Sequence, residues 1–353
     1  MQTINSYGYF FTKVGAPFER RYFAAREPGA EEVVVHIAGC GLCHTDLGFI
    51  SGKVNTNGQI PLILGHEISG KVVASGNAFQ HLVGKNVVIP AVLPCGECEL
   101  CKGGRSNICR NQKMPGNDFN GGFASHITVP ARFVCEIPNN TGKFKLEQLS
   151  VIADAVTTPY QSVMRSNLKK GDLAVVIGVG GIGIYMAQFA KQAGAKVIAI
   201  DIDDAKLQKA KQLGMDFAIN SQNMPEKDLK DAIRNLVKEN KLPKHQWKVF
   251  ETSGTAAGQN VAFSLLSFAG TVAIVGFTMD KVTIRLSNIM AFDADLFGNW
   301  GCKPEYYPEV VTMVLDEKIN ILDNIEVHPL DSINEIIPMA LGHKLEKRVL
   351  FKP

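Results

Sequence analysis

The chain has 353 residues, of which 46% are hydrophobic and 20% are charged, and its formal net charge at pH 7 is +3. This composition is typical of globular rather than disordered proteins, and at ~150 residues per domain the length predicts two domains. The charge is too small, and Lys and Arg are too dispersed, to indicate a nucleic-acid partner.

The chain shows no targeting or membrane signal. Its first residues lack a basic start followed by an apolar core, so no signal peptide is predicted and we expect a cytoplasmic protein. The longest uncharged run, 173–190, could span a membrane by length, but its four glycines argue against this and we expect no membrane contact. Eight cysteines without a secretion signal favour metal binding or catalysis over disulfides.

Residues 1–155 are predicted to form a β-rich first domain. Short runs of β-type residues are separated by Gly, Pro and Asn, which indicates a small barrel or sandwich whose loops carry the chemistry. The predicted strands are 32–37, 68–74, 86–89, 124–129 and 133–137.

Residues 156–297 alternate strand and helix patterns, which predicts a doubly wound parallel sheet. The predicted strands are 173–177, 196–200, 217–219, 248–251 and 271–275. The predicted helices are 182–193, 204–213, 228–239 and 256–268. Residues 298–353 contain one helix pattern, 304–316, and a final strand, 348–351; they are too short to fold alone, so we expect them to pack back on the first domain.

A glycine-rich turn follows the first strand of the second domain. Residues 178–183 read G-V-G-G-I-G between a strand and a helix, and Asp201 ends the next strand. This context is typical of a dinucleotide site, in which Gly178 makes the turn, Gly180 admits the pyrophosphate and Gly183 allows close packing. Asp201 would accept hydrogen bonds from a ribose diol and repel a 2′-phosphate, which predicts NAD rather than NADP. The alternative is a plain sheet turn.

Four cysteines form a compact motif in the first domain. Cys95, Cys98, Cys101 and Cys109 have the spacing C-x2-C-x2-C-x7-C, which predicts a closed structural zinc site. A disulfide cluster is disfavoured by the expected compartment. An iron–sulfur cluster is disfavoured by the last gap and by the lack of a proline after the fourth cysteine.

Other candidate metal ligands are dispersed along the chain. Cys43 lies in G-C-G-L-C-H-T-D, His66 in G-H-E and Asp154 in A-D-A-V-T-T. Sequence spacing alone does not assemble these three residues. Together with the four-cysteine motif, the glycine turn and Arg348, however, they resemble the zinc-dependent medium-chain alcohol dehydrogenases over essentially the whole chain.

This resemblance implies an α/β plus β fold: a GroES-like β-barrel catalytic domain and a Rossmann NAD-binding domain. It implies NAD, two Zn²⁺ per chain and a homodimer or homotetramer. Cys43, His66 and Asp154 would bind the catalytic zinc, with Asp154 at a position where relatives often have cysteine, and Glu67 would be a carboxylate able to reach the metal transiently. Thr45 would relay the proton.

The cofactor residues come partly from the motif and partly from the resemblance, which implies that His44 and Arg348 lie near the pyrophosphate and Lys206 near the adenosine ribose. Val275 and Gly276 end a strand at the edge where ligands bind in such sheets. The full predicted set is Gly178, Gly180, Gly181, Ile182, Gly183, Asp201, Lys206, Val275, Gly276 and Arg348. Many relatives carry a histidine where this chain has Gly48, so we expect the proton relay to end differently.

Three stretches, 40–49, 90–118 and 152–172, are similar to the 6-hydroxycyclohex-1-ene-1-carbonyl-CoA dehydrogenases of anaerobic aromatic degradation. The similarity implies oxidation of a cyclic allylic secondary alcohol, carried as a CoA thioester, to the enone; water addition to that enone is a side activity we also weigh. Candidate phosphate contacts are Lys53, Arg105, Lys113 and Lys303. The alternatives are another secondary or aromatic alcohol as substrate, or a non-catalytic cofactor-binding relative.

Overall fold

The computed structural model describes residues 4–353, which form two compact units. Unit 1 comprises the chain up to Thr157 together with Gly301–Glu317 and Ile321–Pro353, and unit 2 comprises Thr158–Trp300 and Lys318–Asn320. Within residues 4–353, no helix is long and apolar enough to cross a membrane.

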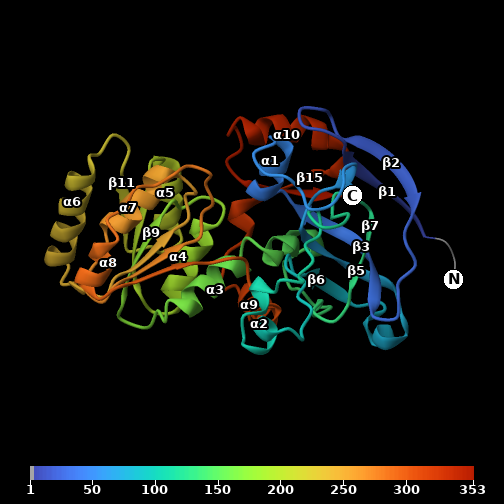
Figure 1. Cartoon of the computed structure of the whole chain (residues 1–353), viewed down its shortest axis with the longest axis horizontal. Helices are drawn as coiled ribbons and strands as arrows, with labels where there is room; N and C mark the ends of the chain where they lie inside the picture. Colours follow the sequence, from blue (N-terminus) through green and yellow to red (C-terminus); the bar gives the residue numbers. More distant parts are fainter. Residues whose placement is uncertain (1–3) are drawn as a thin grey trace. The chain divides into compact units, whose positions relative to one another are not determined.

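Unit 1 is built on two mainly antiparallel sheets (Figure 1). The larger has the strand order β15-β16-β3-β5-β6-β8, with β7 also paired to β3, and the smaller has the order β2-β1-β4. The strands are β1 (Asn5–Phe11), β2 (Glu19–Ala24), β3 (Glu32–Gly41), β4 (Leu62–Ile63), β5 (Glu67–Ser75), β6 (Asn86–Ile89), β7 (His126–Pro130), β8 (Cys135–Ile137), β15 (Ile325–Pro329) and β16 (Arg348–Lys352).

The core of unit 1 lies against β3. Val33, Val35 and Ile37 alternate along this strand toward one apolar cluster, as the two-residue period of a strand requires. The same cluster holds Phe123 and Phe351, whose rings meet edge to face with centroids 5.4 Å apart. The strands that carry the candidate ligands are therefore anchored on a packed core.

The helices of unit 1 are α1 (His44–Ile50), α2 (Glu99–Lys102), α9 (Tyr307–Leu315) and α10 (Ile333–Leu341). A 3₁₀ helix, Leu146–Ala153, packs on β3 and β5. Gly39 allows this approach, because a Cβ there would lie 2.5 Å from the carbonyl oxygen of Glu147. The 3₁₀ helix ends immediately before Asp154 and so brings that carboxylate toward the sheet.

Unit 2 is a six-stranded, all-parallel sheet with the order β11-β10-β9-β12-β13-β14, which confirms the doubly wound prediction (Figure 1). The strands are β9 (Leu173–Ile177), β10 (Lys196–Asp201), β11 (Phe217–Asn220), β12 (Lys248–Glu251), β13 (Thr271–Ile274) and β14 (Asp295–Gly298). The helices are α3 (Thr157–Arg165), whose first residue still belongs to unit 1, α4 (Gly183–Gln192), α5 (Asp204–Gln212), α6 (Glu226–Glu239), α7 (Ala256–Ser264) and α8 (Ser287–Phe292). The order of the strands reverses between β9 and β12, where such sheets bind ligands.

The structure corrects several expected element bounds. The helix expected over 256–268 ends at Ser264, because Leu265 and Leu266 join the core from a turn and not from a helix. The strand expected over 133–137 begins at Cys135, and the strand expected over 124–129 covers His126–Pro130. The sequence patterns did not predict β1, β2, β4, β14, β15, α1, α2, α3, α8 and α10.

Candidate metal centres and nucleotide site

The four cysteines predicted as a metal site lie together in a loop after β6. Their sulfur separations are 3.5 Å for Cys98–Cys101 and Cys95–Cys109, 3.7 Å for Cys98–Cys109 and 4.0 Å for Cys95–Cys101. A tetrahedral site with Zn–S bonds of about 2.3 Å places sulfurs about 3.8 Å apart, whereas a disulfide needs about 2.05 Å. The arrangement therefore fits a tetrahedral metal and not a pair of disulfides.

The backbone of this loop favours thiolates. The N–H groups of Glu97 and Cys98 point at the Cys95 sulfur and lower the pKa of Cys95 to about 6. The N–H of Cys101 lowers the pKa of Cys98 in the same way. Gly96 makes the turn at φ 78°, and a Cβ there would lie 2.7 Å from the guanidinium carbon of Arg132. The backbone of the loop thus stabilises thiolates even without a bound ion.

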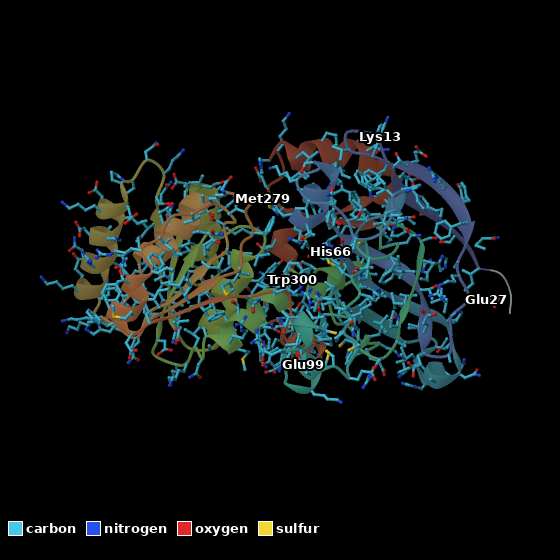
Figure 2. The ribbon with its side chains drawn as sticks, in the orientation of Figure 1. Lys13, Glu27, His66, Glu99, Met279 and Trp300 are labelled. Atoms are coloured by element: carbon cyan, nitrogen blue, oxygen red, sulfur yellow. The ribbon has the colours of Figure 1, made fainter. Side chains whose placement is uncertain are left out.

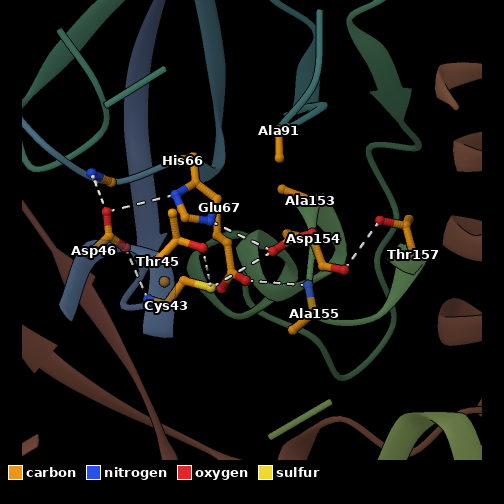
Figure 3. Close-up of polar contacts among 12 residues, drawn as sticks. Cys43, Thr45, Asp46, His66, Glu67, Ala91, Ala153, Asp154, Ala155 and Thr157 are labelled. Atoms are coloured by element: carbon orange, nitrogen blue, oxygen red, sulfur yellow. Dashed lines mark hydrogen bonds and ion pairs between the residues drawn. The ribbon is translucent and has the colours of Figure 1, made fainter. Parts of the chain in front are cut away.

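The structure also assembles the three dispersed candidate ligands (Figure 3). Asp154 Oδ2 lies 3.7 Å from Cys43 Sγ and 3.6 Å from His66 Nε2. In a tetrahedral zinc site with ordinary bond lengths, such pairs are about 3.3–3.5 Å apart. Glu67 completes the group: one ligand atom from each of the four residues lies within 4.8 Å of the others.

His66 is the most informative member of this cluster. Its side chain is 1% exposed, yet neither ring nitrogen has a hydrogen-bond partner within residues 4–353. Burial alone would lower the pKa of His66, but the nearby Asp46 and Cys43 raise it well above its ordinary value. The neighbouring negative groups therefore favour a positive charge at this ring. A bound metal cation would supply that charge and would also bind a ring nitrogen that lacks a hydrogen-bond partner.

Asp46 connects the segments that carry the cluster. Its carboxylate accepts hydrogen bonds from the backbone N–H of Cys43 at 3.0 Å and of Gly65 at 3.0 Å, and it lies 3.6 Å from His66 Nδ1. Asp46 is fully buried in the first turn of α1. One carboxylate thus ties the start of α1 to the residue before His66 and places a negative charge beside the imidazole.

Glu67 and Arg348, predicted separately as a metal neighbour and a cofactor residue, form a buried ion pair. Arg348 Nε donates to Glu67 Oε2 at 2.8 Å and Nη2 donates to Oε1, which also accepts from Ala155 N at 3.2 Å. Gly41 of β3 pairs with Glu67 on one side and with Leu350 of β16 on the other, so the strand register creates this contact.

The charges of this pair influence each other. Burial raises the pKa of Glu67, and Arg348 opposes that rise. Burial alone would lower the pKa of Arg348, but the adjacent carboxylates, Glu67 foremost, raise it. Arg348 therefore stays cationic beside the cluster and holds the Glu67 oxygens in the described structure, while its predicted contact with a pyrophosphate stays a prediction.

The remaining predicted catalytic residues follow Cys43 on α1. Thr45 is half-buried, and its Oγ1 lies 3.8 Å from the Cys43 sulfur. His44 is exposed. At Gly48 an added Cβ would meet only Val54, at 3.7 Å, so the absence of a side chain there is not forced by packing.

In unit 2 the glycine turn has the sterics that the motif predicts. Gly178 has φ 83°, and a Cβ on it would lie 2.6 Å from the Ser253 backbone. A Cβ on Gly183 would lie 1.7 Å from the Gly178 carbonyl oxygen. Around Gly180, by contrast, no atom of the described residues lies within 4 Å of an added Cβ, so the backbone there is open to a ligand. The turn therefore offers a cradle of the kind that a pyrophosphate needs.

Asp201 lies at the end of β10, beside this turn. Its carboxylate accepts from the N–H groups of Val179 at 2.8 Å, Ile202 at 2.8 Å and Asp203 at 3.1 Å. These bonds keep an acid, with both oxygens oriented, at the position where the motif needs one.

The other predicted cofactor residues lie at the same sheet edge or just beyond it. Lys206 is exposed on α5, and Gly181 and Ile182 lead into α4. The N–H groups of Val275 and Gly276 donate to the Glu251 carbonyl oxygen, which folds the end of β13 toward β12.

Comparison with known proteins agrees with these sites. Residues 29–139 match the alcohol dehydrogenase GroES-like domain, and residues 181–316 match the zinc-binding dehydrogenase domain. An alcohol dehydrogenase of Geobacillus stearothermophilus is 30% identical over 323 residues, covering 91% of this chain and 92% of that protein. The chain belongs to the zinc-binding alcohol dehydrogenase family. Its proteins are oxidoreductases, and the predicted GroES-like plus Rossmann fold is confirmed.

Solved structures of the family superpose over nearly the full length. A zinc-binding dehydrogenase of Sinorhizobium meliloti, solved with bound NADP, has a TM-score of 0.87 at 27% identity and covers 99% of this chain and 100% of that one. The alcohol dehydrogenase of Aeropyrum pernix also has a TM-score of 0.87, at 25% identity, and covers 98% of this chain and 100% of that one.

Sequence reasoning missed one polar group of the Rossmann unit in this dehydrogenase. Thr252 Oγ1, just after β12, donates to the carbonyl oxygens of Ile177 at 2.9 Å and Gly178 at 2.6 Å. Glu251 Oε1 in turn accepts from Ser253 N at 2.8 Å. These residues brace the glycine turn from the neighbouring strand. The available signal was the polar E-T-S-G run at a strand end beside the point where strand order reverses.

Proposed function

We propose that the protein is a zinc- and NAD-dependent dehydrogenase that oxidises a secondary alcohol to a ketone. The observation that carries the proposal is the buried cluster of Cys43, His66 and Asp154, in which a nearly inaccessible imidazole has no hydrogen-bond partner in the part of the chain that the structure describes. Buried polar atoms are normally paired. Family membership and this orphaned ring together support a metal site.

The two proposed metal sites have different roles. Cys43, His66 and Asp154 would hold the catalytic zinc and leave one position for the substrate oxygen. When bound there, zinc supplies Lewis-acid polarisation of that oxygen. A thiolate, a carboxylate and a neutral imidazole balance its charge. The four-cysteine loop has no open position and would hold a structural zinc.

Thr45 is proposed to pass the substrate proton onward. Its hydroxyl lies beside Cys43, and a hydroxyl can accept one proton while it donates another. The hydroxyl is too weak a base to hold the additional proton, so it must release one proton as it accepts the other. Because Gly48 carries no side chain on the same helix, we propose that the proton then leaves directly to water.

The nicotinamide cofactor is proposed to bind along the glycine turn. Gly180 leaves room for the pyrophosphate, and Asp201 would accept from the ribose diol. Its negative charge supports NAD over NADP, although the Sinorhizobium meliloti relative was solved with NADP. The experiment is to compare kcat/KM with each cofactor in the wild type and in Asp201→Ala. We expect a preference for NAD that Asp201→Ala weakens by ~10-fold or more, and an unchanged preference would contradict the assignment.

The substrate class is the finest part of the proposal. We propose 6-hydroxycyclohex-1-ene-1-carbonyl-CoA, a cyclic allylic alcohol carried as a thioester, in anaerobic aromatic degradation. Support comes from the three similar stretches of sequence noted above. Lys53 and Arg105 are exposed cations that a CoA phosphate would attract.

The eight free cysteines support the proposal that the protein works in a reducing compartment, the cytoplasm.

The deciding experiment follows NADH absorbance with the thioester, with the same alcohol lacking CoA, and with a panel of simple alcohols. Fast turnover of the thioester alone is the expected result. Turnover of simple alcohols alone would leave the zinc mechanism standing and remove the CoA substrate. Mass spectrometry of the enone after long incubation would detect water addition, and absence of an adduct would dispose of that side activity.

We also propose that the protein assembles as a homodimer or homotetramer. Among residues 4–353, β14 pairs only with β13 and is an open edge of the sheet. Exposed apolar side chains lie on β14, on α8 and immediately before α8: Leu296 is 37%, Met290 76% and Leu286 66% exposed. Open edges and apolar patches of this kind favour association. Light scattering would test the proposal, and a monomer at micromolar concentration would contradict it.

A further inference from the structure

The third proposed ligand, Asp154, follows a helix end that cannot orient it unaided. The 3₁₀ helix Leu146–Ala153 stops at Ala153, and Asp154 has φ −143° and ψ −59°, outside the helical region. The last carbonyl groups of a helix have no partner inside the helix. The direction of the Asp154 carboxylate therefore depends on what holds the peptide between Ala153 and Asp154.

Tyr307 holds that peptide. It is the first residue of α9 and 1% exposed, and its hydroxyl donates a hydrogen bond to the Ala153 carbonyl oxygen. The N–H of Ala91 lies 3.3 Å from both the Tyr307 hydroxyl oxygen and the Ala153 carbonyl oxygen. Three chain segments therefore meet at one carbonyl group. Burial raises the pKa of Tyr307, so its hydroxyl stays protonated and donates.

The flanking groups hold the rest of this segment but leave the Ala153 peptide to Tyr307 and Ala91. Thr157 Oγ1 lies 3.4 Å from the Asp154 carbonyl oxygen, and Ala155 N donates to Glu67 (Figure 3). These bonds act after the Asp154 side chain in the sequence. The Tyr307 bond acts before it and comes from 154 positions away in the chain.

We propose that Tyr307 is a positioning residue for Asp154: by fixing the Ala153 carbonyl, its hydroxyl aims the carboxylate at Cys43 and His66. This role rests on the proposed catalytic metal site. A packing role would require only the aromatic ring, which phenylalanine retains. A positioning role requires the hydroxyl, and loss of such supporting groups typically weakens metal binding by about 10–100-fold.

The test compares Tyr307→Phe with the matched control Tyr9→Phe. Tyr9 is also a buried tyrosine of unit 1, but its hydroxyl donates to Asp331, which is not part of the cluster. The readout is the rate at which zinc passes from the purified protein to a chelating dye, with the Cys43→Ser variant identifying the phase that belongs to the buried cluster. We expect that phase to be about 10-fold faster in Tyr307→Phe and unchanged in Tyr9→Phe.

A double-mutant cycle separates positioning from general destabilisation. If Tyr307 acts through Asp154, Tyr307→Phe should have no further effect on zinc release in an Asp154→Asn background. Equal effects in both backgrounds, or a wild-type rate in Tyr307→Phe, would overturn the role. Should Tyr307→Phe not fold, 3-fluorotyrosine at position 307 keeps the ring and makes the hydroxyl a stronger donor. It should slow release by about twofold, and an unchanged rate would contradict the role.

Failure of the proposed function would look different. If the wild type and Cys43→Ser contain the same amount of zinc and release it identically, the buried cluster holds no metal and the site itself is wrong. If the Cys43-dependent phase of zinc release exists but its rate is unchanged by Tyr307→Phe, only the positioning role is wrong.

Discussion

The two metal-ligand clusters of unit 1 are assembled in opposite ways. In the four-cysteine loop, Cys95 and Cys109 are 14 positions apart, and three of the four cysteines are partly exposed. In the buried cluster, Cys43 and Asp154 are 111 positions apart, and His66 is 1% exposed. The first is a local loop whose own backbone N–H groups favour thiolates. The second exists only because β3, β5 and the 3₁₀ helix pack together.

We expect this difference in assembly to match a difference in role, with the loop acting on stability and the buried cluster on the chemical reaction. In the proposed structural site, four thiolates in a short loop would leave no position for another ligand, so the ion would only hold the loop together. In the proposed catalytic site, three mixed donors, supported by Asp46 and by the Glu67–Arg348 pair, would leave one position open for the substrate. Variants of the two clusters should therefore fail in different ways.

The largest effect is expected for Cys43→Ser. Losing the thiolate should empty the buried cluster and remove several kcal/mol of transition-state stabilisation, so kcat should fall by at least ~10³-fold. Zinc content measured by atomic emission should drop by one ion per chain. The matched control is Cys40→Ala, which removes a buried thiol outside both clusters and should keep both ions. Full activity in Cys43→Ser would refute the assignment.

Thr45→Ala should be the next most damaging change. It leaves the donors of the buried cluster in place but removes the hydroxyl proposed to pass the proton, so kcat should fall by ~10²-fold or more at neutral pH. Zinc content and the melting temperature should stay at wild-type values. Thr45→Ser, which keeps a hydroxyl, should recover most of the activity. If Thr45→Ala turns over like the wild type, the cluster needs no hydroxyl relay.

Cys98→Ser in the loop should act on stability first. Loss of one of four ligands should release the structural ion and cost about 3 kcal/mol, or roughly 10 °C in melting temperature. Calorimetry would measure this, with Cys135→Ala as a control thiol outside both clusters. At low temperature, activity per remaining buried-site zinc should be close to wild type. A large loss of kcat without a shift in melting temperature would contradict a purely structural role for the four-cysteine loop.

The smallest effect concerns the reactivity of the metal-free loop. Because backbone N–H groups lower the pKa of Cys95 to about 6, while burial and its cysteine neighbours raise that of Cys101 to about 12, Cys95 should be the thiolate at pH 7. Iodoacetamide should therefore modify Cys95 at least ~10-fold faster than Cys101 after zinc removal. The rate should rise with pH through a midpoint near 6, as peptide mass spectrometry would show. Equal labelling of both cysteines would contradict this picture.

The sequence alone predicted those groups whose members are close together along the chain. The cysteine spacing predicted a group that the structure brings together, and the glycine turn predicted a cradle whose sterics the structure shows. Both depend on backbone geometry within a few residues, which local composition specifies. Regular alternation of apolar runs likewise predicted the parallel sheet, because each strand and helix carries its own period.

Tertiary structure alone decided how distant side chains meet. Glu67 and Arg348 are 281 positions apart, and they pair because β3 lies between β5 and β16 in a particular register. Asp154 reaches Cys43 because Gly39 lets the 3₁₀ helix approach β3, and Tyr307 reaches Ala153 from the C-terminal segment. No local pattern encodes such contacts. They follow from strand pairing and close packing across the whole unit, which is why a resemblance could suggest the candidate ligands while only the fold could show which residues surround them.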